Sequence, residues 1–386
     1  MKVTLSTVGK FHSFHLAQQL YKHDALEAIY TGYPKFKLKN SGVPAKNIKS
    51  FPLFRGSYMY FSQFLSQHPK IKRELGWWAH EYLDIYSSKT LPECDIFMAL
   101  SGVGQYTGKV QKERGGVYIC DRGSAHILYQ EELLQEEHYL LDIPYQSIDQ
   151  RIIDKELAEY EEANTITIPS NFAMESFIQK GISPTKLCEI PYGVNLSTFS
   201  EQNIANNNEF NIVFIGGTLV QKGLFYLIEA FNKITIKNKT LTIIGSVNYE
   251  INKLKKFTHL SYDNVVFTGN IDHDQLQEQL MIAHVLVQPS IQDGFGMVMA
   301  EAMACGCPVI ATTNTGASDL FTDGKEGFIV PIRSSDAIAE KLQVLADNPD
   351  LQQNMSTAAL KKVQSLGGWD TYGDNTMSLF NELLNK

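Results

Sequence analysis

The residue pattern most suited to chemistry lies between Asp293 and Glu301, where a glycine-rich loop leads into an apolar segment. Apart from Glu301, every side chain from Met297 to Cys305 is apolar. A helix of this composition is expected to be buried over most of its circumference, so a charge in its second turn needs a polar partner. Two partners remain open. Backbone amides or a lysine would make Glu301 a structural residue, whereas a pair of ligand hydroxyl groups would make it a binding residue.

The segments on either side of this loop favour the binding interpretation. Residues 285–287 form a strand-like run before the loop, and residues 308–312 form another one after the apolar segment. The loop is therefore expected at the carboxyl end of a parallel strand, where open α/β sheets bind their ligands. The glycines also leave backbone amides bare beside a helix N-terminus, which suits an anionic or polyhydroxyl ligand.

A second glycine loop spans residues 216–223 and contains Lys222. It follows a predicted strand at 211–215 and precedes a predicted helix at 224–231. Amide donors together with a lysine at a helix start can hold phosphate oxygens. The loop is not a Walker loop, because the GKS/T ending and its spacing are missing. A purely structural turn is the alternative, although both glycine loops are expected at one edge of one sheet.

The first half of the chain offers two further loops at strand ends. His126 follows the predicted strand 117–121 and is expected to hydrogen-bond a substrate hydroxyl across a cleft. The alternative is a helix N-cap at Ser124 with His126 in the first turn. Residues 8–12, which include Gly9 and Lys10, form the other loop. The run 272–274 (Asp-His-Asp) resembles a metal-binding motif, but its position before a predicted helix favours a cap, and no metal site is predicted.

Short β-branched runs alternate with helical patterns along the whole chain, which predicts two doubly wound α/β domains facing a cleft. The domains are expected at residues 1–194 and 195–368, with a polar linker at 200–208. A helix at 369–386 is expected to dock on either domain. The predicted strands are 3–7, 26–31, 95–100, 117–121 and 165–168 in the first half, and 211–215, 240–244, 264–267, 284–288, 308–312 and 327–330 in the second half.

Composition narrows the class of protein. The chain has 386 residues, 44% of them hydrophobic, and a formal net charge of -8, so nothing in its charge balance indicates nucleic-acid binding. Its five cysteines lack CxxC spacing, which argues against a disulfide framework or a zinc site and suits a reducing compartment. The first residues lack the apolar core of a signal peptide, and no apolar run approaches the roughly 20 residues of a membrane span. These features predict a cytoplasmic protein.

Charge is unevenly distributed, because residues 28–73 contain no acidic side chain. Aromatic residues are interleaved with the basic ones in this region. It is either a solvated face or a surface that attracts anionic lipid head groups, at about 1 kcal/mol per basic residue, and peripheral membrane binding therefore remains open. The nine basic residues are Lys35, Lys37, Lys39, Lys46, Lys49, Arg55, Lys70, Lys72 and Arg73.

With these motifs in hand, the chain resembles the retaining glycosyltransferases of family 4, which have the GT-B fold. The resemblance is strongest from residue 211 to about residue 345. It is carried by segments 222–231, 265–269 and 293–312, the last of which is similar to the family's Glu-x7-Glu region. Segments 169–172 and 190–195 match more weakly. The first half matches loosely, as expected of the half that binds the acceptor.

The resemblance implies a role for individual residues. Glu301 is similar to the glutamate that holds the ribose hydroxyls of a nucleotide donor, and Asp293 stands where the residue that contacts the donor sugar is found. Lys222 is similar to the lysine that neutralises the diphosphate, His126 to the histidine near the transferred sugar, and Gly9 to the glycine of the first-strand loop. The implied donor-binding residues are Gly216, Gly217, Gly269, Gly294, Phe295, Gly296 and Met297.

Two departures from the family pattern affect these expectations. Asp293 is one methylene shorter than glutamate, so the identity of the sugar cannot be carried over. Where the family usually has an arginine near the lysine, this chain has Gln221 and Gly217. This loss of charge weakens stabilisation of the departing diphosphate, unless Arg122 or Lys10 supplies the charge from the first domain.

The implied activity is retaining transfer of a sugar from a UDP- or GDP-type donor to a hydroxyl of a glycan, glycolipid or other acceptor. It needs no cofactor and no obligatory metal. A nucleotide-sugar epimerase and a catalytically idle nucleotide-sugar-binding subunit are the alternatives. The oligomeric state is not indicated by the sequence.

Overall fold

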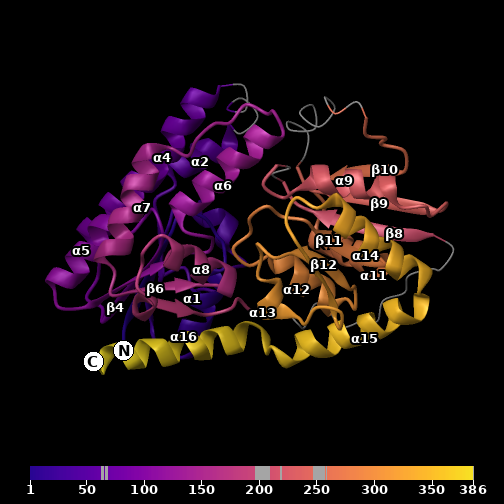
Figure 1. Ribbon diagram of the computed structural model, residues 1–386. Helices are drawn as coiled ribbons and strands as arrows, with labels where there is room; N and C mark the ends of the chain where they lie inside the picture. The colour runs from indigo at the N-terminus through magenta and orange to yellow at the C-terminus, as the bar shows by residue number, and fades with distance from the viewer. Residues whose placement is uncertain are drawn as a thin grey trace.

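The computed structural model describes residues 1–61, 65, 68–195, 209–217, 220–246, 257 and 259–385. The predicted linker at 200–208 lies outside the described residues. Two parallel β-sheets, each covered by helices, form two domains that lie side by side (Figure 1). The expected pair of doubly wound α/β domains is confirmed.

The first sheet has seven strands in the order β3-β2-β1-β4-β5-β6-β7, and all of its strand pairs are parallel. Five of these strands were predicted. β3 and β7 were missed because each has only three residues and lies at an edge of the sheet, with one fully buried residue in β3 and none in β7. The bounds are β1 Val3–Thr7, β2 Leu26–Thr31, β3 Ile48–Ser50, β4 Ile96–Leu100, β5 Val117–Asp121, β6 Thr165–Ile168 and β7 Leu187–Glu189.

The second sheet has six strands in the order β10-β9-β8-β11-β12-β13, again all parallel. All six were predicted. Both faces of each sheet are covered by apolar clusters, which is why the strands read as nearly continuous apolar runs. The bounds are β8 Phe210–Ile215, β9 Lys239–Ile244, β10 Val265–Gly269, β11 Val285–Gln288, β12 Val309–Thr312 and β13 Gly327–Val330.

The helices bury one apolar stripe each against the sheets. In α9, for example, Leu224, Leu227, Ile228 and Phe231 are buried at helical spacing. The helices of the first domain are α1 Ser13–Lys22, α2 Leu53–Tyr60, α4 Pro69–Thr90, α5 Gln105–Glu113, α6 Ile127–Leu140, α7 Gln150–Glu162 and α8 Asn171–Gln179, with 3-10 turns η1 Lys35–Leu38 and η2 Pro184–Lys186. The helices in the second half of the chain are α9 Leu224–Lys233, α11 His273–Ile282, α12 Met297–Ala304, α13 Ala317–Leu320, α14 Ser335–Asp347, α15 Pro349–Ser365 and α16 Gly368–Leu384.

The last helix returns to the first domain. α15 packs on α12 of the second domain, and α16 then packs along α1 (Figure 1). Tyr372 and Phe380 of α16 belong to the buried cluster on the first sheet, and Trp369 stacks on His15 with ring centroids 4.0 Å apart. The chain therefore links its two domains at two places.

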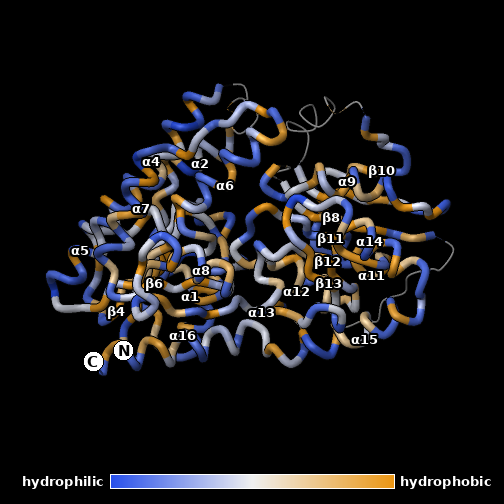
Figure 2. The backbone as a smooth tube through the Cα atoms, in the orientation of Figure 1, coloured by the Kyte–Doolittle hydropathy of each residue, from blue (hydrophilic) through white to orange (hydrophobic). Residues whose placement is uncertain are grey.

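Apolar residues gather along the strands in the middle of each domain, and hydrophilic residues predominate on the outer helices (Figure 2). Within the described part of the chain, no helix combines the length and the apolar composition that crossing a membrane requires.

Candidate active site

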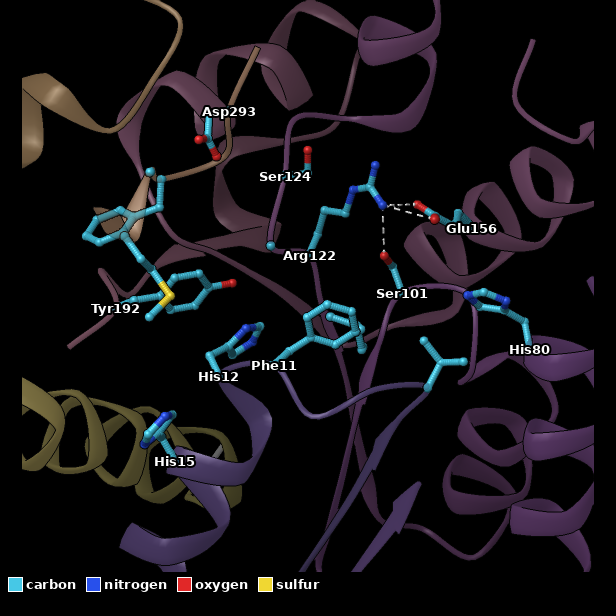
Figure 3. A pocket seen from close by; sticks show the side chains of 16 residues that line it. Phe11, His12, His15, His80, Ser101, Arg122, Ser124, Glu156, Tyr192 and Asp293 are labelled. Atoms are coloured by element: carbon cyan, nitrogen blue, oxygen red, sulfur yellow. Dashed lines mark hydrogen bonds and ion pairs between the residues drawn. The ribbon is translucent and has the colours of Figure 1, made fainter. Parts of the chain in front are cut away.

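A cavity of about 540 Å³ lies between the two domains, at the carboxyl ends of their strands (Figure 3). The first domain contributes the loops after β1, β4 and β5, and the second contributes the loop that begins α12. Its lining residues are Val8, Phe11, His12, His15, His80, Leu100, Ser101, Arg122, Gly123, Ser124, Glu156, Tyr192, Asp293, Phe295, Gly296 and Met297.

The second-domain wall is the glycine loop identified from the sequence. Gly296 adopts a left-handed conformation (φ 78°) as the N-cap of α12, so the helix starts beside the cavity. Lys222 Nζ lies 2.5 Å from Asp293 Oδ2, and both side chains are largely buried. Gln288 Nε2 donates to the same carboxylate oxygen at 3.3 Å. The two glycine loops that the sequence placed at one edge of a sheet are therefore joined by an ion pair.

The two domains touch directly through this loop. Gln292 Nε2 donates to Ser124 Oγ, and Ser170 Oγ donates to the carbonyl oxygen of Gly294, each at 2.5 Å. A Cβ atom on Gly294 would lie 2.2 Å from the carbonyl oxygen of Gly123. Only glycine allows this approach, so Gly294 positions the second-domain loop against the first domain.

Glu301 lies one turn into α12, on the face of the helix that is not fully buried. Met297 and Val298 are on the same side, and Met297 lines the cavity. No hydrogen bond or ion pair to another described residue is present at the Glu301 carboxylate, and its pKa is raised by burial, an effect partly offset by nearby His273. The partner that the structural alternative requires, a lysine or a set of amides, is absent from the described part of the chain.

This unpaired carboxylate leads to a stability prediction. The pKa of Glu301 in the folded protein is above its ordinary value of 4.5, so ionisation of this carboxyl group destabilises the folded protein at neutral pH. Well below pH 4.5 the group is protonated in both the folded and the unfolded protein, and the effect disappears. Glu301→Gln is therefore expected to raise the melting temperature at pH 8, and the gain should shrink as the pH falls towards 4. A gain of 1 kcal/mol corresponds to about 2–4 °C. Thermal unfolding of both proteins across this pH range measures it, and a lower melting temperature of the variant at pH 8 would contradict it.

A second cavity of about 310 Å³ lies wholly in the second domain. It is formed by the ends of β8 and β9 and by the residues after β10, including Gly216, Gly217, Gly245 and Asn270. Nothing described lies within 4 Å of a Cβ atom placed on Gly217 or Gly269, so both backbones border open space. Backbone and apolar groups, rather than charges, make up its walls.

The floor of the first cavity holds a histidine that the sequence did not single out. His12 Nε2 lies 2.5 Å from Asp121 Oδ2, and Asp121 Oδ1 accepts a hydrogen bond from Thr167 Oγ1 at 2.9 Å. The His12 ring stacks on Tyr192 with centroids 4.2 Å apart. Tyr192 in turn contacts Phe295 of the second domain edge-on. The loop containing His12 was expected to face the cleft, but the partnership with Asp121, 109 residues away, has no signal in the sequence.

Arg122 lines the cavity but is held in place by the first domain. Its Nη1 pairs with Glu156 Oε2 at 2.8 Å and donates to Ser101 Oγ at 3.1 Å (Figure 3). Its Nη2 donates to Gln130 Oε1 at 2.8 Å. Its Nε donates to the carbonyl oxygen of Ala125. The guanidinium is nearly buried and its charge is paired with Glu156. This geometry does not match the expectation that Arg122 supplies a positive charge to the diphosphate site of the second domain.

The structure corrects the expected position of His126. It is the N-cap of α6: its Nδ1 accepts a hydrogen bond from the backbone amide of Leu128 at 3.2 Å, and Ser124 does not cap this helix. The side chain is buried against Tyr160 and Phe177, and it is not among the residues that line the cavity. Burial lowers its pKa to about 4. The helix-capping interpretation thus applies to His126 itself, and His12 is the histidine at the cavity floor.

The other predicted positions differ in their distance from the cavity. Gly9 lies next to lining residue Val8 and accepts a hydrogen bond from Thr31 Oγ1 through its carbonyl oxygen. Lys10 is exposed and does not line the cavity.

Asp272 forms a capping box at the start of α11 with Gln275, as the cap interpretation predicted. Cavity residues not predicted individually include Tyr192, Glu156, His15 and His80.

Solved structures share this two-domain fold. Sucrose-phosphate synthase from Thermosynechococcus elongatus superposes with a TM-score of 0.73 at 19% identity, covering 100% of this chain and 99% of that one. Anabaena Alr3699/HepE, solved in complex with UDP-glucose, gives a TM-score of 0.71 at 16% identity and covers 100% and 99% of the two chains. At these identities the likeness establishes the fold, which is the expected GT-B architecture.

Sequence relatives match part of the chain. The capsular polysaccharide biosynthesis glycosyltransferase CapM of Staphylococcus aureus is 32% identical over 183 residues, which are 46% of this chain and 47% of CapM. A D-inositol 3-phosphate glycosyltransferase of Streptomyces scabiei is 37% identical over 118 residues, 31% of this chain and 26% of the relative. The chain spans about half the length of several curated relatives that it matches.

The family model described as glycosyl transferases group 1 matches residues 197–362, which include both glycine loops, Lys222, Asp293 and Glu301. The family resemblance drawn from these motifs is therefore confirmed. Through this segment the chain is similar to the glycosyl transferases group 1 family, and its two-sheet fold is that of the solved structures above.

Proposed function

We propose that the protein transfers a sugar from a nucleoside diphosphate sugar to an acceptor hydroxyl, with retention at the anomeric carbon. The observation that carries the proposal is the arrangement around the start of α12. Lys222 and Asp293 are paired beside the cavity between the domains, and Glu301, without a partner among the described residues, follows one turn later. A cation for phosphate on one glycine loop thus lies against a carboxylate for sugar hydroxyls on the other, and the helix that follows the second loop carries a carboxylate for ribose.

In this proposal each group contacts a different part of the donor. Glu301 accepts hydrogen bonds from the ribose hydroxyls, and Lys222 binds the diphosphate together with backbone amides of residues 294–297. Asp293 receives hydroxyls of the transferred sugar. The second cavity, with Gly216 and Gly217 in its wall, takes the nucleoside. Binding the donor therefore requires Lys222 to exchange part of its contact with Asp293 for phosphate oxygens.

The chemical step follows from where charge develops. Breaking the bond between the anomeric carbon and the β-phosphate builds negative charge on the departing phosphate, so a fixed cation and amide donors stabilise the transition state more than the ground state. The carboxylates that line the cavity are both paired, Glu156 with Arg122 and Asp293 with Lys222. We therefore propose direct front-side displacement, in which the leaving phosphate takes the acceptor's proton. Lys222 and the amides supply the charge stabilisation, so no metal is required.

A thermal-shift screen tests donor binding directly. A ligand at 100 times its dissociation constant stabilises the folded protein by about 2.7 kcal/mol, so one group among UDP, GDP and ADP sugars is expected to raise the melting temperature by several degrees. Because Glu301 is assigned to the ribose, the corresponding free nucleoside diphosphate should also stabilise the protein. Absence of stabilisation by every nucleotide sugar would contradict the proposal.

We also propose that the acceptor is reached at an anionic membrane surface. The support is a basic surface, defined as Lys35, Lys37, Lys39, Lys46, Lys49, Lys70 and Lys72, all of which are exposed. Apolar side chains are exposed beside these lysines, among them Phe36 at 69%, Leu53 at 61% and Tyr60 at 84%. Lysines that attract lipid head groups, combined with rings that enter the interface, are typical of peripheral membrane proteins.

Co-sedimentation with vesicles tests this surface. Wild-type protein is expected to bind vesicles that contain phosphatidylglycerol, less so as salt increases. Replacing Lys35, Lys37 and Lys39 together by glutamate should weaken binding more than tenfold, since each basic residue contributes about 1 kcal/mol. The matched control reverses Lys325, Lys361 and Lys362 in the second domain. Equal binding to neutral phosphatidylcholine vesicles, or an equal loss in the control, would contradict the proposal.

A further inference from the structure

We infer that the His12 imidazole, oriented by Asp121, is the group that receives the acceptor's reacting hydroxyl. The inference rests on the proposed transfer reaction and adds to it a specific acceptor contact in the first domain. His12 lies on the floor of the cavity, below the second-domain loop that carries Asp293 (Figure 3).

The imidazole is held in one orientation from several sides. Its Nε2 contacts the Asp121 carboxylate, which is itself anchored by Thr167. One face of the ring stacks on Tyr192, and Tyr372 of the returning helix α16 contacts it edge-on. His12 and Asp121 are 7% and 5% exposed. A ring fixed by a carboxylate and two aromatic neighbours is a preorganised hydrogen-bonding group rather than a mobile surface histidine.

The Asp121 contact determines which nitrogen faces a substrate. A carboxylate only accepts hydrogen bonds, so the hydrogen of the neutral ring is on Nε2 and the lone pair is on Nδ1. His12 is the N-cap residue of α1, yet its side chain makes no capping hydrogen bond. This is the reverse of His126, whose Nδ1 is used to cap α6. Nδ1 of His12 has no hydrogen-bond partner among the described residues, so it is available to accept from the acceptor's hydroxyl and orient it as the acceptor binds. During transfer this hydrogen bond breaks, the hydroxyl oxygen bonds to the anomeric carbon, and its proton passes to the leaving phosphate.

The remaining groups around the cavity are less suited to this role. Arg122 and Glu156 neutralise each other, as do Lys222 and Asp293. His15 stacks on Trp369, and its pKa is lowered to about 4, mainly by burial. Of the cavity histidines, only His12 combines an orienting carboxylate with a position next to Tyr192, which reaches Phe295 across the domain boundary.

The neighbouring residue Phe11 supports an acceptor at this place. Its φ of 33° is unfavourable for a residue with a Cβ atom, and its ring is 53% exposed while lining the cavity. Strained backbone of this kind is concentrated at binding sites. An exposed ring on the residue before His12, lining the same cavity, provides a flat surface for the apolar face of a sugar whose hydroxyl points to His12.

The variant His12→Gln tests the inference, because the glutamine amide can still donate to Asp121 while the Nδ1 acceptor is lost. The assay uses the nucleotide sugar that stabilises wild-type protein most. It measures the release of nucleoside diphosphate with water alone and with p-nitrophenyl β-glucoside as acceptors. The variant is expected to keep the donor-induced rise in melting temperature and to release nucleoside diphosphate at least tenfold more slowly, because water and sugar hydroxyls both need Nδ1. His23→Gln, at the exposed end of α1, is the matched control.

Other outcomes separate this inference from the proposed function. Release by His12→Gln at the wild-type rate would overturn the acceptor role of His12 while leaving the transferase proposal intact. Loss of the donor-induced rise in melting temperature would also overturn it, because His12 would then belong to the donor site. If wild-type protein neither binds nor turns over any nucleotide sugar, the proposed function fails first. Asp121→Asn, which keeps a hydrogen-bond acceptor for Nε2, should show a smaller loss than His12→Gln, as expected of a positioning residue.

Discussion

Replacing Lys222 with alanine is expected to lower the rate constant for nucleoside diphosphate release about 100-fold. Lys222 is paired with the glycine loop of α12, where its Nζ lies 2.5 Å from Asp293 Oδ2. Removing one preorganised group that stabilises developing charge typically costs 10²–10³ in turnover. Gln221 and Gly217 occupy the places where the family resemblance implies an arginine, and Arg122 is paired with Glu156, so we expect neither to compensate for the loss. Steady-state turnover with the true donor measures the effect.

The control for Lys222→Ala is Lys233→Ala, at the C-terminal end of α9, the helix that follows the Lys222 loop. Lys233 pairs with Asp336 on the protein surface, so its loss should leave turnover within about twofold of wild type. The melting temperature of Lys222→Ala is expected to fall modestly, because Asp293 loses its ion-pair partner. Near-normal turnover in Lys222→Ala would remove Lys222 from the site.

The second large effect is expected for Glu301→Ala, as a loss of donor affinity of at least tenfold. A carboxylate that accepts two ribose hydroxyls makes charge-assisted hydrogen bonds, and a tenfold loss corresponds to about 1.4 kcal/mol. Isothermal titration with the nucleoside diphosphate measures this effect without requiring an acceptor.

Glu278→Ala on α11 is a suitable control, since Glu278 is exposed in the same domain. Together with the rise in melting temperature expected for Glu301→Gln, these results would show a residue kept for binding at a cost in stability. If Glu301→Ala bound the nucleotide as tightly as wild type, the carboxylate would be structural after all.

Local patterns in the sequence predicted most of the fold. Buried parallel strands read as apolar runs, so eleven strands were located, and both glycine loops were placed at strand ends. β3 and β7 were missed because three-residue edge strands bury too little to leave a pattern. Glu301 was found because a charge in an apolar helix is conspicuous.

The first-domain site was harder to predict, because its residues are brought together only by packing. His126 and His12 both follow strands, and nothing in their neighbourhoods says which ring points to the cavity. The deciding facts are the hydrogen bond of His126 to Leu128 and the contact of His12 with Asp121. Likewise, the Arg122–Glu156 pair depends on how α7 packs beside β5.

The most direct test of the central claim follows the anomeric proton of the sugar by NMR during turnover. The protein is incubated with a donor whose sugar is α-linked, with and without p-nitrophenyl β-glucoside, and the first product is observed before it equilibrates. We predict an α-configured product and free nucleoside diphosphate, at rates that fall in Lys222→Ala. A β-configured product, an isomerised nucleotide sugar, or binding without any turnover would contradict retaining transfer. The last two outcomes would instead identify an epimerase and an idle binding subunit, respectively.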